Sequence, residues 1–170
     1  MSRHETEHKK AMKRSMSRRS FASALTTAVL FWSGALLGAE QLGTADEARA
    51  MLERAVAALK DNEADALKAF NDEKNKQFRD RDLYVYCFGM ADGKFTAYKE
   101  PFLLGADIRK LKLYGEPMGQ QAFDLAHDAP AGSVVTIEYK LPKPGTNTPS
   151  PKEAFQTRVG NQACGVAYYK

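Results

Sequence analysis

The stretch Asp82–Pro101, DLYVYCFGMADGKFTAYKEP, decides how the rest of the chain folds. It predicts two β-strands joined at Asp92-Gly93, because Val, Tyr and Phe favour pleated surfaces and Asp-Gly supplies the backbone of a tight turn. In the first strand, period-two alternation creates an aliphatic face and an aromatic face. The aliphatic face carries Leu83, Val85 and Cys87, and the aromatic face carries Tyr84, Tyr86 and Phe88. Neither face is polar, so we expect both to be covered.

The aliphatic face has a suitable cover upstream, in the segment Thr44–Lys60. Thr44 and Glu47 have the spacing of a capping box, in which each side chain satisfies a free backbone N–H at a helix start. Behind this box, apolar residues recur at helical spacing while charged residues face outward. These apolar residues are Ala48, Leu52, Ala55, Val56 and Leu59. We therefore expect a long amphipathic helix, followed by a shorter helix that contains Phe70.

The aromatic face has no helix of comparable strength to cover it. Phe102–Gln121 mixes short apolar groups with Gly and Pro, which is typical of a pocket wall or lid, and a short helix is expected over Gln120–Asp128. The last third predicts three strands, at Ser133–Leu141, Glu153–Val159 and Ala163–Tyr169. This order indicates an α+β fold with an antiparallel sheet, helices on one face and crossing segments on the other.

Residues 1–39 have the features of an export signal. Basic residues end in Ser17-Arg18-Arg19-Ser20-Phe21, an apolar stretch over Ala22–Leu37 follows, and a small-residue cleavage point precedes Glu40. The twin-arginine-like SRRSF leaves both the twin-arginine and the general secretory route open. If uncleaved, residues 22–39 would anchor the protein in the membrane. In both cases we expect residues 40–170 to form one domain outside the cytoplasm, periplasmic or secreted.

The charge of the predicted domain argues against a nucleic-acid partner. The leader up to Ala39 has seven Lys or Arg against two Glu, whereas the chain from Glu40 onward has 18 basic and 19 acidic residues. A near-neutral domain lacks the basic surface that binds a phosphate backbone. The carboxylates Asp80 and Asp82 lie in a polar stretch and are expected to be solvated.

The two cysteines, Cys87 and Cys164, each lie in the middle of a predicted strand. In an oxidising compartment they would form a disulfide that closes a long loop. The alternative is a pair of reduced thiols packed in the core as small hydrophobic groups. The sequence leaves both open, because the disulfide requires the two strands to be adjacent in a register that the sequence does not define.

Several motifs resemble those of one known family. The run Asp82–Lys112, then YGEPMGQQAF, YKLPKPG and the C-terminal SPKEAFQTRVGNQACGVAYYK, resembles the single-Cache (sCache) sensor domains over Thr44–Lys170. The resemblance implies a PAS-like fold, with a five-stranded antiparallel sheet, a long N-terminal helix on one face and short helical or irregular segments on the other. It also implies an extracytoplasmic module that binds a small molecule, often a short organic acid. Tyr98 stands where the family commonly has a histidine, so a ligand contact through that histidine does not transfer.

Catalytic chemistry is sparse after the leader. The only histidine there is His127 and the only serines are Ser133 and Ser150, so a catalytic triad would depend on a single base. No His or Cys cluster has the spacing of metal ligands. We expect no enzyme, no cofactor and no metal; an enzyme that uses His127 or Cys87 is the weakest of the alternatives.

Binding chemistry is better represented. A small carboxylate needs one or two cationic or hydroxyl donors in an otherwise apolar pocket. Strand tyrosines and basic residues of the covering segments offer such donors, although each residue taken alone is more often a packing or solvated residue. The candidate ligand-binding residues are Tyr84, Tyr86, Tyr98, Arg109, Tyr139 and Lys152.

These residues predict an exported, stand-alone small-molecule-binding or sensor domain for a short-chain organic acid. The sequence ends at Lys170, directly after the last predicted strand. We therefore expect any signal to pass to a separate membrane-bound kinase or chemoreceptor. The alternative is a structural or protein-interaction module of the cell envelope whose pocket is filled by side chains.

Overall fold

The computed structural model describes residues 41–170, and the predicted export signal at residues 1–39 lies outside the described residues. The helices are α1 (Ala45–Asp61), α2 (Glu63–Asn71) and α3 (Met118–Asp128), with short 3-10 turns η1 (Pro101–Leu103) and η2 (Ile108–Lys110). The strands are β1 (Arg79–Asp80), β2 (Leu83–Gly89), β3 (Phe95–Ala97), β4 (Val134–Pro142), β5 (Pro149–Val159) and β6 (Gln162–Tyr169).

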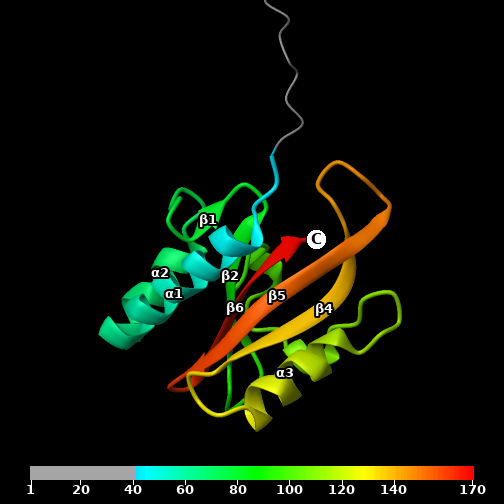
Figure 1. Ribbon diagram of the computed structural model, residues 1–170. Coiled ribbons are helices and arrows are strands. Elements are labelled where there is room, and N and C mark those ends of the chain that lie inside the picture. Colours follow the sequence, from blue (N-terminus) through cyan, green and yellow to red (C-terminus); the bar gives the residue numbers. More distant parts are fainter. Residues whose placement is uncertain (1–40) are drawn as a thin grey trace, which may run out of the picture. The chain divides into compact units, whose positions relative to one another are not determined.

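The strands form one antiparallel sheet in the order β1-β2-β6-β5-β4, with β3 paired to the end of β2 (Figure 1). The predicted α+β fold is confirmed. The sheet has six strands rather than five, because Arg79 and Asp80 pair with Tyr84 and Leu83 where a loop was expected. In addition, β5 begins at Pro149, four residues before the predicted start at Glu153, because its ladder with β4 continues to the pair Pro142–Pro149.

Helices α1 and α2 cover one face of the sheet (Figure 1). The capping box of α1 is present, with Thr44 accepting from the Glu47 backbone N–H and the Glu47 carboxylate accepting from the Thr44 N–H. The apolar side of α1 packs on the aliphatic face of β2, as the sequence predicts. The strand residues of this core include Leu83, Val85, Cys87, Phe155, Cys164 and Val166.

A disulfide joins Cys87 to Cys164 in the centre of this core. The two residues are directly opposite each other on β2 and β6, with their Cα atoms 4.1 Å apart, and neither is exposed to solvent. Of the two alternatives that the sequence leaves open, the structure has the cross-linked one. It closes a loop with a sequence separation of 77 residues.

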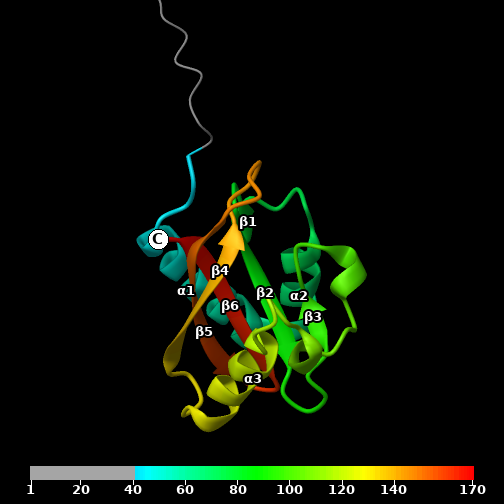
Figure 2. The ribbon, with the colours of Figure 1, turned by 90° about the vertical axis from the view of Figure 1, so that its right-hand side faces the viewer.

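The opposite face of the sheet is covered by α3, η2 and the segment that joins them (Figure 2). Helix α3 lies close to η2 because residue 119 is a glycine: a Cβ at Gly119 would collide with the carbonyl oxygen of Ile108. The apolar residues on this side are smaller and more aromatic than those beneath α1. They include Phe88, Phe95, Ile108, Ala122, Ala126, Ile137, Ala154 and Ala163.

No helix among residues 41–170 has the length and hydrophobicity needed to cross a membrane.

Removing the disulfide should lower the stability of the protein without changing its fold. For the double variant Cys87→Ala/Cys164→Ala we expect the free energy of unfolding to fall by about 4 kcal/mol, because a cross-link closing a loop of this length restricts the unfolded chain by about that amount. Urea denaturation of the oxidised wild type and the variant measures the change. An unchanged denaturation midpoint would show that the cross-link contributes nothing to stability.

Candidate ligand-binding site

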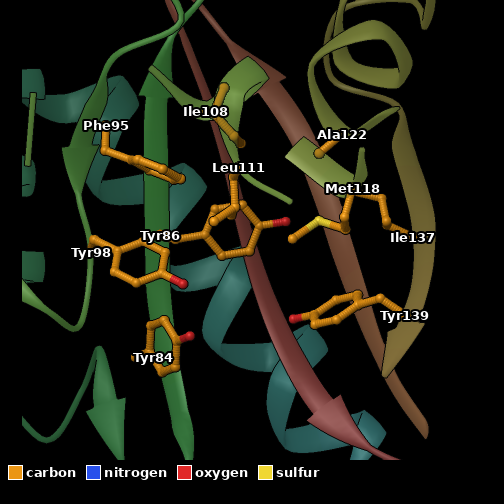
Figure 3. A pocket seen from close by; sticks show the side chains of 10 residues that line it. All are labelled: Tyr84, Tyr86, Phe95, Tyr98, Ile108, Leu111, Met118, Ala122, Ile137 and Tyr139. Atoms are coloured by element: carbon orange, nitrogen blue, oxygen red, sulfur yellow. The ribbon is translucent and has the colours of Figure 1, made fainter. Parts of the chain in front are cut away.

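A cavity lies between the aromatic face of the sheet and its cover of η2 and α3 (Figure 3). The cavity has a volume of about 30 Å³, which is enough for about two waters or a short chain of heavy atoms. Strands β2, β3 and β4 supply its aromatic walls, and η2 and α3 supply aliphatic groups. The lining consists of Tyr84, Tyr86, Phe95, Tyr98, Ile108, Leu111, Met118, Ala122, Ile137 and Tyr139.

Tyr86 forms the floor of the cavity, and its hydroxyl is used within the fold. The hydroxyl donates to Oε1 of Gln156 at 3.0 Å, and Nε2 of Gln156 donates to the Ala122 carbonyl at 2.8 Å. Gln156 is fully buried, so this relay ties β2, β5 and α3 together. The ring lies directly over Gly165, where a Cβ would collide with it. Tyr86 therefore offers a ligand its ring rather than its hydroxyl.

Tyr84, Tyr98 and Tyr139 direct their hydroxyl oxygens into the space between β2 and β4 (Figure 3). The rings of Tyr84 and Tyr98 meet edge to face, with centroids 5.6 Å apart. Burial, reinforced by the neighbouring tyrosines, raises the pKa of Tyr84 and of Tyr139 well above the usual value. Both side chains therefore remain neutral hydrogen-bond donors at physiological pH.

A second cavity of about 250 Å³ shares Tyr84 and Tyr98 with the first cavity and contains Lys152. Lys152 lies on β5, where its neighbours in the ladder are Tyr139 and Tyr169. Its residue surface is only 2% exposed. We call the two adjoining cavities together the aromatic–lysine site.

The ammonium group of Lys152 has no hydrogen-bond or ion-pair partner among residues 41–170. It lies 4.2 Å from the ring centroid of Tyr169 and 5.8 Å from that of Tyr84, which are cation–π distances. Burial lowers the pKa of Lys152 from its usual value to about 8, although the carboxylate of Asp82 acts in the opposite direction. At pH 7 the site therefore holds the positive charge of a largely buried lysine without a counter-ion in contact.

The surface next to the second cavity is also rich in basic groups. A neighbouring hollow of about 550 Å³ is lined by Lys99 and Lys143, by Asp82, and by Arg81, whose guanidinium is paired with Glu47 and Asp80. Clusters of one charge sign raise the local concentration of oppositely charged small molecules. This surface favours the approach of an anion to Lys152.

Arg109, also predicted to bind the ligand, lies elsewhere. Its guanidinium donates to both carboxylate oxygens of Asp107 at 2.8 Å and to the Asp92 carbonyl at 2.8 Å, and it stacks 5.1 Å from the Phe123 ring centroid. It lines neither cavity of the aromatic–lysine site. These bonds hold the Asp92-Gly93 turn against η2, so the structure gives Arg109 a role in the fold instead.

The structure also differs from the expectation for Asp82. It was predicted to be solvated, but its residue surface is only 6% exposed, because Oδ1 accepts from the backbone N–H of Gly43 at 2.6 Å and draws the side chain inward. It lines the second cavity beside Lys152. The strand alternation contains a signal for this position: extended one step back from Tyr84, it places Asp82 on the aromatic face.

The residues of the enzyme alternative lie outside the aromatic–lysine site. Cys87 is held in the disulfide beneath α1, and the side chain of His127 is 67% exposed, next to Asp128 on α3. Within residues 41–170, no three His, Cys, Asp or Glu side chains form a group that could hold a metal ion.

Solved structures of sensor domains share this architecture. The periplasmic sensor domain of a chemotaxis protein has a TM-score of 0.51 and 20% sequence identity, over 73% of this chain and 88% of the other. A methyl-accepting chemotaxis protein from Vibrio parahaemolyticus RIMD 2210633 has a TM-score of 0.56 and 18% identity, over 73% and 86%. A Cache chemosensory domain, whose title describes the structural basis for carboxylic acid recognition, has a TM-score of 0.51 and 17% identity, over 70% and 83%.

No protein-family model and no curated protein sequence matches the chain. The similarity to these solved structures covers 70–73% of the chain, although only 17–20% of the residues are identical. The resemblance to the Cache family is thus confirmed for the fold: residues 41–170 have the architecture of a Cache-type sensor domain.

Proposed function

We propose that this protein is an exported binding or sensor domain for a short-chain organic acid, held in the aromatic–lysine site. The carboxylate pairs with the ammonium group of Lys152 and accepts hydrogen bonds from the hydroxyls of Tyr84 and Tyr98. The apolar tail occupies the cavity between the tyrosines and α3. The observation that carries the proposal is the buried, positively charged Lys152 without a partner among the described residues.

The energetics of Lys152 favour an anionic ligand. A charge removed from water costs several kcal/mol unless an opposite charge and hydrogen bonds compensate for it. A carboxylate supplies both, through charge-assisted bonds that are about twice as strong as neutral ones. The ring faces of Tyr84 and Tyr169 compensate only in part, since cation–π contacts contribute about 1–2 kcal/mol. The ligand-free site is thus prepared for an anion.

The size of the first cavity restricts the ligand. Its approximately 30 Å³ fits only a short tail, so acids of two to four carbons fit better than longer chains. The Cache structure whose title names carboxylic acid recognition supports the same chemical class by analogy of fold.

Three further features belong to this proposal. Residues 1–39 would direct export, by the twin-arginine or the secretory route, or would anchor the domain if retained. The buried disulfide supports an oxidising compartment outside the cytoplasm, since such bonds are rare in the cytosol. The chemotaxis receptors among the structures with this fold suggest that a membrane-bound chemoreceptor or kinase receives the signal.

The small volume of the first cavity also agrees with one alternative function. If the space around Tyr86 and Met118 is filled by side chains in solution, the domain would be a structural or protein-interaction module of the cell envelope. The two functions differ in whether any short acid stabilises the protein.

Binding of a short acid is the first test. In isothermal titration with acetate, propionate and butyrate, we expect at least one acid to bind the full chain, with hexanoate weaker because its tail exceeds the cavity. The affinity should fall above about pH 8, because Lys152 loses its charge there. If neither these acids nor hydroxy and amino acids of the same length bind the protein or raise its melting temperature, the proposed function fails.

Replacing Lys152 should separate function from stability. We expect Lys152→Met to abolish acid binding and to raise the free energy of unfolding of the ligand-free protein at pH 7 by on the order of 2 kcal/mol, because it removes a buried unpaired charge. The folded-state pKa of about 8 lies below the value of 10.5 for the unfolded chain, so the wild type should recover stability as the pH rises from about 8 to about 10.5, and the difference from the variant should narrow.

Urea denaturation at several pH values measures this effect, with Lys140→Met as the control. Lys140 is an exposed lysine on β4, so its replacement should change neither binding nor the pH dependence. A Lys152→Met variant that still binds acids with wild-type affinity would contradict the proposed role of this residue.

A further inference from the structure

Asp82 and Lys152 bring two opposite charges to one cavity without direct contact. Both residues line the second cavity of the aromatic–lysine site, and both are more than nine-tenths buried. No ion pair within 4.0 Å joins them, although the carboxylate of Asp82 raises the pKa of Lys152 against the effect of burial. The cavity therefore has a cationic and an anionic position.

The Oδ2 atom of Asp82 has no hydrogen-bond partner among the described residues. Its other oxygen, Oδ1, is used by the N–H of Gly43 at 2.6 Å. Buried carboxylate oxygens without partners are rare, because each forfeits the hydrogen bonds that it had in water. A donor that came within hydrogen-bond distance of this buried oxygen would supply the bond that it lacks.

The backbone around Asp82 keeps this oxygen in place. Arg81 has a left-handed backbone with φ 54°, and its guanidinium bonds to Glu47 at 2.7 Å and to Asp80 at 2.8 Å. Gly43 packs against the side chain of Leu83 so closely that a Cβ would not fit. The segments that contain Arg81 and Gly43 are thus held in place, so the position of the free oxygen of Asp82 does not depend on a flexible loop.

From this arrangement we propose that the acid bound here carries a second hydrogen-bond donor, a hydroxyl or ammonium group near its carboxylate, which donates to Oδ2 of Asp82 while the carboxylate pairs with Lys152. This inference rests on the proposed function, because it assumes that a short acid occupies the site. It names the ligand class as short hydroxy or amino acids rather than unsubstituted acids. Asp82 is then the residue that determines specificity.

The test compares three acids with the same number of carbons, propionate, lactate and alanine, which differ only at the second carbon. In titration of the full-length protein, lactate or alanine should bind roughly tenfold or more tightly than propionate, which is the effect of one hydrogen bond to a charged acceptor. This ranking is measured on the wild type, so it does not depend on the folding of any variant.

The variant Asp82→Asn then identifies the acceptor. Asparagine keeps an oxygen for the N–H of Gly43 but places an NH2 group where Oδ2 was, so the preference for alanine, whose ammonium group can only donate, should fall to less than about twofold. Propionate should bind the variant as well as the wild type, or more tightly, because a negative charge near Lys152 is removed. Asp80→Asn is the matched control: Asp80 lines neither cavity, and the preference should persist.

Equal affinities of the wild type for all three acids would overturn the inference while leaving acid binding intact. A preference for alanine over propionate that survives in Asp82→Asn would also overturn it, and would show that Asp82 serves Lys152 only as a distant counter-charge. If none of the three acids binds, the proposed function fails as well, together with this assignment of Asp82.

Discussion

The alternation of side chains along β2 is the constraint on which the structure depends. One face of this strand is aliphatic and packs beneath α1, where its central residue, Cys87, is cross-linked to Cys164 on β6. A shift of the strand by one residue would exchange the two faces and bury the tyrosines under the helix. Because the disulfide and the helix both hold the aliphatic side, Tyr84 and Tyr86 must point toward α3. The cavity is a consequence of this fixed register.

The cover on the aromatic side differs physically from the cover on the other side. Helix α1 is long and continuous, whereas η2 and α3 are short and meet at Gly119, where the backbones touch. A cover of this kind leaves space that a continuous apolar helix would fill. The space is lined by neutral tyrosines and one buried cation, so it suits a molecule with a charged end and a small apolar part. In the proposed complex, the carboxylate of the ligand would supply the partner that Lys152 lacks among the described residues.

Much of the fold was predictable from sequence because its signals are local. The capping box at Thr44, the alternation in β2 and the Asp92-Gly93 turn each specify their own element. Strand β1 was not predictable from the sequence, because Arg79 and Asp80 pair only through contacts set by the tertiary fold. The tyrosine positions followed from alternation alone. The environments of Arg109 and Asp82 could not be predicted from alternation, because they depend on partners such as Asp107 and the backbone of Gly43.

The most direct test of this account is the pKa of the Lys152 side chain, measured by heteronuclear NMR on the full chain with and without a saturating short acid. We expect a pKa of about 8 in the ligand-free protein and a clear rise when the acid binds, because a carboxylate stabilises the ammonium form. A pKa near the ordinary lysine value in both states would contradict it: Lys152 would then be solvated or already paired, and the site would not be prepared for an anion.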